Sequence, residues 1–241
     1  MNCFCIKIGF FTGRKNRIMK NKDLIQLSIG IIQFLSNQFL MAQLTVYKEP
    51  HHKIVYSNEF IRIIDLRLLP GDTTLVHTHD AASAVIFLTS SRVAIRDQGK
   101  SPNITDVQPG NTVYRPYDET PVLHTVWVED HSPFRCLVIE SIPGKDSLNA
   151  CKSAPIKPFH LLWMQKSIEA YEAILLKGEN STLATFNCKY LLVVYNGKLN
   201  LGLNGARHTI SPGEFLFIAN QSSMEIEAAD TDAGIVLLKI K

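Results

Sequence analysis

The chain alternates between short apolar runs and polar turns along most of its length. β-branched and aromatic residues are frequent in the runs, and Gly, Pro, Asn or Asp separates one run from the next, a pattern typical of strands. In the first half the runs predict strands at 60–69, 84–88, 92–96, 112–115, 123–128 and 134–140. In the second half they predict strands at 170–176, 190–195, 215–219 and 234–240. So many short strands indicate an all-β fold, either a sandwich or a barrel.

Helical patterns are nearly absent. One or two helical turns are predicted at 159–166, and no segment has the period of a long amphipathic helix. Pro, Gly, Lys and Ser are frequent around 143–158, as in a linker. We therefore expect an N-terminal barrel at 43–142, a linker at 143–160 and a C-terminal barrel at 161–241.

The two halves repeat one plan. Pro109-Gly110 in the first half corresponds to Pro212-Gly213 in the second, and each pair precedes an aromatic-containing strand. His77 and His79 of the first half align with Ala184 and Phe186, and His124 falls near Met224. None of these positions in the second half carries an imidazole. The second copy is therefore expected to keep the scaffold, in degenerate form, and to bind no metal.

The N-terminal segment 1–42 resembles an export signal. Lys20 and Lys22 precede the apolar run 24–35, and small residues among 36–42 suggest cleavage after Ala42. Met19 is a candidate start, and an uncleaved helix or anchor is the alternative interpretation. The apolar run is too short and too interrupted to be a good membrane-spanning helix. We expect an exported protein, periplasmic or secreted, with no stable membrane insertion after cleavage.

The charge of the chain is concentrated in that segment. It holds six basic residues and one acidic residue, so the net charge falls from +3 for the whole chain to −2 for 43–241. The remaining body has no basic stripe, which argues against a nucleic-acid partner. Of its three cysteines, Cys136 and Cys188 lie in apolar runs typical of a core, and Cys151 could pair with either in an oxidising compartment.

The most specific chemical feature is the pair His77 and His79. Side chains one residue apart on a strand project from the same face, so both imidazoles point the same way. The pair follows a turn at Pro70-Gly71, and His124 follows a second turn at Pro109-Gly110. Three imidazoles on one wall of a barrel would form a divalent-metal site. The alternative is that these are solvent-facing or core histidines without a metal.

These residues resemble the two motifs of the cupin superfamily. The first motif has Gly, five residues, then His-x-His and a following Glu; Gly71, His77 and His79 match it in register. Ser83 and Ala84 occupy the places where the Glu is expected. In the second motif Gly110 and Pro116 match in register, and His124 follows after a longer gap than usual.

The resemblance implies two cupin β-barrels of jelly-roll type, the second degenerate. It also implies a divalent metal held by His77, His79 and His124, with Fe(II) favoured and Mn, Zn, Ni or Cu compatible. Without the Glu the protein ligands are neutral, which favours a small anionic organic ligand and resembles the three-histidine iron dioxygenases. A non-catalytic ligand-binding or structural cupin is the alternative. A metal-free, epimerase-like cupin with a histidine base is a third.

Further residues complete the expectations for the site. Tyr114, Arg115 and Tyr117 flank the second motif and are predicted at the mouth of a substrate pocket, the alternative being a strand aromatic and a solvated arginine. Open sheet edges of such barrels could also pair in a homodimer. The remaining histidines match no motif and are interpreted as surface or loop residues: His51, His52, His131, His160 and His208.

Overall fold

The computed structural model describes residues 44–142, 157–184, 188–203, 206–219 and 223–241. The expected export signal at 1–42, and 143–156 of the expected linker with Cys151, lie outside the described residues. Gln43–Lys241 forms one compact unit. In the described ranges, no helix has the length and apolar character needed to cross a membrane.

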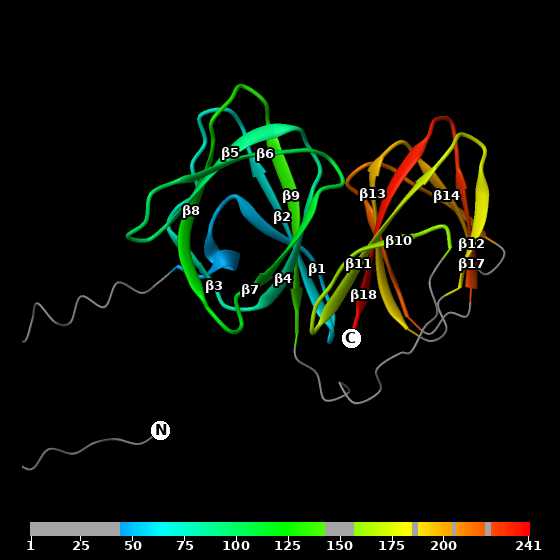
Figure 1. Cartoon of the computed structure of the whole chain (residues 1–241), viewed down its shortest axis with the longest axis horizontal. Helices are drawn as coiled ribbons and strands as arrows, with labels where there is room; N and C mark the ends of the chain where they lie inside the picture. Colours follow the sequence, from blue (N-terminus) through cyan, green and yellow to red (C-terminus); the bar gives the residue numbers. More distant parts are fainter. Residues whose placement is uncertain (1–43, 143–156, 185–187, 204–205, 220–222) are drawn as a thin grey trace, which may run out of the picture. The chain divides into compact units, whose positions relative to one another are not determined.

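The first half consists of a short 3-10 helix and nine strands (Figure 1). The helix is η1 (Val46–Lys48), and the strands are β1 (His52–Ser57), β2 (Ile61–Leu68), β3 (His77–His79), β4 (Ala82–Phe87), β5 (Ser91–Asp97), β6 (Asn103–Val107), β7 (Thr112–Pro116), β8 (Val122–Val128) and β9 (Phe134–Ser141). They form two antiparallel sheets, β1-β2-β9-β4-β7 and β3-β8-β5-β6. Each strand predicted in this half overlaps one of these.

The described part of the second half repeats this topology. Its strands are β10 (His160–Met164), β11 (Ile168–Leu175), β12 (Asn180–Ala184), β13 (Lys189–Asn196), β14 (Leu199–Leu203), β15 (Ala206–Ile210), β16 (Phe215–Ile218), β17 (Ser223–Ala228) and β18 (Ala233–Ile240). The sheets run β10-β11-β18-β13-β16 and β12-β17-β14-β15, which is the strand order of the first half. The prediction of an all-β chain with two jelly rolls is confirmed.

The long central strands are buried on both faces, which explains their nearly continuous apolar runs. On β9, Val138 points into the first barrel and packs with Ile64 of β2. Its neighbour Ile139 points the other way, into a cluster that also contains Leu191 and Val236 of the second half. Alternate residues of one strand therefore fill two different cores, the barrel interior and the contact between the five-stranded sheets.

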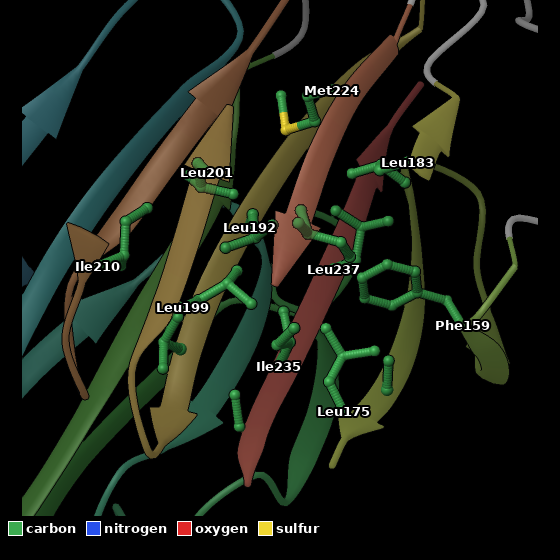
Figure 2. Close-up of a cluster of buried hydrophobic side chains, with 14 of the residues drawn as sticks. Phe159, Leu175, Leu183, Leu192, Leu199, Leu201, Ile210, Met224, Ile235 and Leu237 are labelled. Atoms are coloured by element: carbon green, nitrogen blue, oxygen red, sulfur yellow. The ribbon is translucent and has the colours of Figure 1, made fainter. Parts of the chain in front are cut away.

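The interior of the second barrel is apolar (Figure 2). Leu183 of β12 pairs with Met224 of β17, and both side chains are buried. The corresponding strands of the first barrel, β3 and β8, pair His77 with His124. Leucine and methionine therefore occupy the strand pair that carries two imidazoles in the first barrel.

The predicted helical turns at 159–166 are wrong. This segment forms β10, an edge strand that pairs with β11 and has a register shift between Leu161 and Trp163. The Trp163 indole Nε1 donates a hydrogen bond to the Thr112 hydroxyl at 2.8 Å. The local apolar pattern is too short to distinguish helix from strand, and the pairing with β11 decides it.

Two described cysteines are buried, as their apolar surroundings predicted. Cys136 is a free thiol in the first core. Cys188 lies in the second core and is disulfide-bonded.

Candidate metal centre

The strand period and the pairing of β3 with β8 bring the three predicted histidines together. His77 and His79 are 0% and 3% exposed and point to the same side of β3. His124 lies opposite His77 on β8. Its ring centroid is 4.8 Å from that of His77 and 5.0 Å from that of His79. The three imidazoles therefore form one buried cluster inside the first barrel.

A fourth histidine, His52, joins the cluster from the first residue of β1. It is buried, and its ring centroid lies 4.4 Å from His77 and 5.7 Å from His79. The candidate ligand nitrogens of His52, His77 and His79 all lie within 4.8 Å of one another. The prediction that His52 is a surface or loop residue is wrong, because β1 pairs with β2 and places His52 beside buried Leu66. Residues 52–56 include β-branched and aromatic side chains that indicate a strand. No sequence motif indicates that the side of this strand with His52 faces the cluster.

The remaining histidines stand apart from this cluster. His51 is half-buried and contacts Glu49. His131, His160 and His208 are exposed, as the sequence predicted, although the last two lie on strands β10 and β15.

Two hydrogen bonds fix the orientation of the rings. The Nδ1 atom of His77 lies 2.7 Å from the Leu75 carbonyl oxygen, and that of His52 lies 2.7 Å from Glu49 Oε2. Each oxygen only accepts, so each Nδ1 carries the proton and leaves a lone pair on Nε2. In a metal site such bonds hold ligating imidazoles in their binding tautomer.

The cluster also contains nitrogens that fit a metal ion. His77 Nε2 and His79 Nε2 are 3.1 Å apart. Two nitrogens that bind one ion at about 2.0–2.1 Å lie roughly 3 Å apart when they are adjacent ligands. Among the described residues, the buried atoms His79 Nδ1 and His124 Nε2 have no hydrogen-bond partner. Buried polar atoms are rarely left unpaired, and a metal ion beside the cluster would satisfy the Nε2 of His124. The Nδ1 of His79 would stay unpaired when its Nε2 is the ligand atom.

The histidines are held in the neutral form. Burial lowers the pKa of His77 to about 4, and repulsion from His52 adds to the effect. Burial, followed by repulsion from neighbouring imidazoles, lowers the pKa of His79 to about 2 and that of His124 to about 3. At neutral pH these rings keep their lone pairs, which is the state that binds metals.

These pKa values predict that the metal-free protein loses stability on acidification. Between about pH 6.5 and 4 the unfolded chain binds protons at His77, His79 and His124 that the folded protein does not bind. The free energy of unfolding should therefore fall as the pH is lowered, by about 1.4 kcal/mol per pH unit for each such proton. Urea unfolding in the presence of a chelator at pH 7.5, 6 and 5 would measure how the free energy of unfolding depends on pH. His79→Gln should reduce the slope, whereas His131→Gln, at an exposed position, should leave it unchanged. Equal stability at pH 7.5 and 5 would contradict the prediction.

A cavity of about 590 Å³ adjoins the cluster. His124, Arg115, Tyr117, Asp97 and Lys100 are among its lining residues. Lys100 is paired with Asp97 at 3.1 Å, whereas Arg115 forms no ion pair within the described part of the chain. The Tyr117 ring is 5.3 Å from that of His79, and burial raises the pKa of its hydroxyl. The cavity thus combines an unpaired cation, a neutral hydroxyl and an imidazole of the cluster.

Tyr114 does not line this cavity. Its hydroxyl is 3.4 Å from the Ser167 hydroxyl, and its ring is 5.9 Å from that of Trp163. Arg115 and Tyr117 line the cavity, and their contact with a substrate stays a prediction. The alternation of side chains along β7 turns Tyr114 to the opposite face.

The two positions at which the motif glutamate is expected hold Ser83 and Ala84, and both side chains are buried. The Ser83 hydroxyl donates to the Ala81 carbonyl at 2.8 Å. Glu140 lies beside Ser83 on β9, and its Oε2 accepts a hydrogen bond from Arg62 at 2.8 Å. Burial raises the pKa of Glu140, and Arg62 opposes that shift. The Glu140 carboxylate beside Ser83 is thus paired with Arg62. The candidate metal ligands are all histidines, so the ligand set is neutral.

Comparison with solved structures places this architecture among known folds. The bacterial pirin YhhW from Escherichia coli, in complex with nickel(II), matches with a TM-score of 0.56 and 16% identity over 82% of this chain and 97% of that one. Procruciferin, an 11S globulin from Brassica napus, matches with a TM-score of 0.56 and 8% identity over 76% and 77% of the two chains. A cupin 2 conserved barrel domain protein from Leptotrichia buccalis matches with a TM-score of 0.51 and 13% identity over 79% of this chain and 88% of that one.

The chain has the bicupin fold. No family model matches its sequence, and no curated protein matches it. At these identities the likeness concerns the fold, and the chemistry of this bicupin has to be argued from its own residues.

Proposed function

We propose that this bicupin binds one divalent metal ion at the histidine cluster of its first barrel. The observation that carries the proposal is the approach of His77 Nε2 to His79 Nε2 at 3.1 Å inside a buried, neutral cluster. His77 and His79 supply two ligands in every arrangement. His52, whose Nε2 is freed by its bond to Glu49, and His124, whose Nε2 is unpaired, are the candidates for the remaining positions.

The donor set restricts the metal to borderline ions. Neutral imidazoles suit Fe(II), Ni(II), Zn(II) and Cu(II) better than Mg²⁺ or Ca²⁺, which prefer oxygen ligands. The resemblance of the sequence motifs favours Fe(II), and the nickel(II) complex of the bacterial pirin supports Ni(II) as a second candidate. Metal analysis of the purified protein, beside a variant that lacks His77 and His79, would identify the ion.

The ligand of the adjoining cavity is proposed to be a small organic anion. Arg115 can donate two parallel hydrogen bonds to a carboxylate, and no described residue occupies it as an ion-pair partner. The neutral histidine ligands leave the charge of a bound cation uncompensated, which also favours an anion. Tyr117 keeps its proton at neutral pH and can donate a hydrogen bond beside His79.

We further propose an iron-dependent dioxygenase as the reaction class. When bound, the ion would supply Lewis-acid and redox chemistry. Arg115 would hold the anionic end of the substrate, and the walls around His124 and Tyr117 would orient its remainder in the cavity. A non-catalytic ligand-binding cupin is the second candidate, favoured by the pairing of the Glu140 carboxylate with Arg62 away from the ligand set.

Oxygen uptake and ligand binding separate the two candidates. The Fe(II)-loaded protein would be tested with a panel of thiols, diketones and phenolic acids. Turnover supports the dioxygenase, and binding without turnover supports the binding protein. In both cases Arg115→Gln should weaken carboxylate binding roughly 10- to 100-fold, since a hydrogen bond to a charged group contributes about 1.5–3 kcal/mol. Lys100→Gln, at a lysine already paired with Asp97, is the matched control. Equal loss in both variants would contradict the role of Arg115.

We also propose that the protein is exported. The disulfide bond of Cys188 supports this location, because disulfides persist in oxidising compartments. Sequencing the N-terminus of the mature protein would test it. A start near residue 43 is expected, and a start upstream of residue 30 would contradict cleavage.

A further inference from the structure

Glu49 is a buried carboxylate just ahead of β1 that the sequence did not single out. It is 1% exposed. Its Oε2 accepts hydrogen bonds from His52 Nδ1 at 2.7 Å and from the His51 amide at 2.8 Å. Its Oε1 accepts from the Leu75 amide at 3.1 Å and contacts His51 Nδ1 at 3.0 Å. Both oxygens thus serve as acceptors, which is the pattern of an ionised carboxylate.

The environment stabilises the charged form of this side chain. Burial alone would raise the pKa of Glu49. The hydrogen bonds from His52, His51 and the Leu75 amide outweigh burial and lower the pKa to about 2.

The same carboxylate reaches a second histidine through the backbone of Leu75. The Leu75 amide donates to Glu49 Oε1, and the Leu75 carbonyl accepts from His77 Nδ1 at 2.7 Å. Glu49 is thus hydrogen-bonded to His52 directly and to His77 through one residue. These hydrogen bonds place the proton of His52 and of His77 on Nδ1. The lone pair of each ring is then on Nε2, where it is free to bind a metal ion.

We propose that Glu49 is a positioning residue of the metal centre, which fixes the binding tautomer of His52 and, through Leu75, the ring of His77. This inference rests on the proposed metal-binding function. A carboxylate behind a ligating imidazole also increases the basicity of that imidazole, and loss of such a partner usually costs about 10- to 100-fold in metal affinity.

A purely structural role for Glu49 would have different consequences. The segment around Glu49 is tied to β3, since the Thr78 amide donates to the Leu44 carbonyl at 2.8 Å and Thr45 bridges Thr78. If Glu49 only anchors this segment, its loss lowers the stability. The tautomer of His52 and the metal affinity of the folded protein would then stay as they are.

The test compares Glu49→Gln with wild type in the full chain, with Ni(II) as the probe. We expect about 10- to 100-fold weaker Ni(II) binding by calorimetry. Nitrogen-15 NMR of the metal-free proteins should show His52 as the Nδ1–H tautomer in wild type and as a mixture in the variant. Glu169→Gln is the matched control, because Glu169 is 6% exposed and paired with Lys239 and Lys241 in the second barrel. It should leave both readouts unchanged.

A double variant shows whether Glu49 acts through His52. In a His52→Ala background, Glu49→Gln should lose most of its effect on Ni(II) affinity, and the residual effect measures the route through Leu75. Equal affinity in Glu49→Gln and wild type would overturn the inference. If Glu49→Gln does not fold, the wild-type spectrum decides, since an Nε2–H tautomer at His52 or His77 would overturn it. Failure of wild type to bind any divalent metal would instead overturn the proposed function, while the tautomer measurement would still report on Glu49.

Discussion

Replacing both His77 and His79 with alanine should abolish stoichiometric metal binding. These two imidazoles carry the nitrogens that approach each other at 3.1 Å, and every arrangement of the site uses them. The affinity should fall by more than about 100-fold, beyond the loss that follows removal of a partner that only supports a ligand. Elemental analysis and Ni(II) calorimetry would measure the effect, and circular dichroism would check the fold.

His131→Ala is the control for this pair, because His131 is exposed and distant in sequence from both histidines. An unchanged metal content in the His77/His79 double variant would contradict the proposed site. The single variants His52→Ala and His124→Ala then distinguish the remaining ligands. The larger loss should fall on His52, whose ligand nitrogen lies within 4.8 Å of those of His77 and His79.

Replacing Leu191 with alanine should destabilise the protein by about 2–5 kcal/mol. Leu191 is fully buried in the cluster that contains Ile139 of the first half and Val236 of the second. Its loss would leave a cavity where the two five-stranded sheets contribute side chains to one core. Because this core is shared, both halves should unfold in one transition. Urea unfolding followed by circular dichroism and by tryptophan fluorescence would measure the free energy of unfolding and test whether the transitions coincide.

Leu161→Ala is the matched control for this substitution. Leu161 is 49% exposed on the edge strand β10, so its truncation should change the free energy of unfolding by no more than about 0.5 kcal/mol. Two separate transitions in wild type, or equal effects of the two leucine variants, would show that the shared cluster does not join the halves energetically.

Much of the fold could be predicted from local patterns. The long central strands have nearly continuous apolar runs because both of their faces are buried, and such a run is recognisable from the sequence without knowledge of the neighbouring strands. Gly71 and Gly110 marked two turns, and both adopt the positive φ that other residues rarely take. Short or polar strands such as β6 and β15 carry too little apolar pattern to be recognised alone, because pairing with their neighbours defines them.

The sequence by itself determined that His77 and His79 point to one side of a strand, because side chains alternate with a period of two. It also indicated the jelly-roll repeat, because each half has the same succession of strands and turns. Only the tertiary structure placed His52 in the cluster and Glu49 behind it, and turned Tyr114 away from the cavity that Arg115 lines. Those outcomes depend on which strands pair and in which register. Such contacts join residues far apart in the chain, and no local pattern of hydrophobic and polar positions records them.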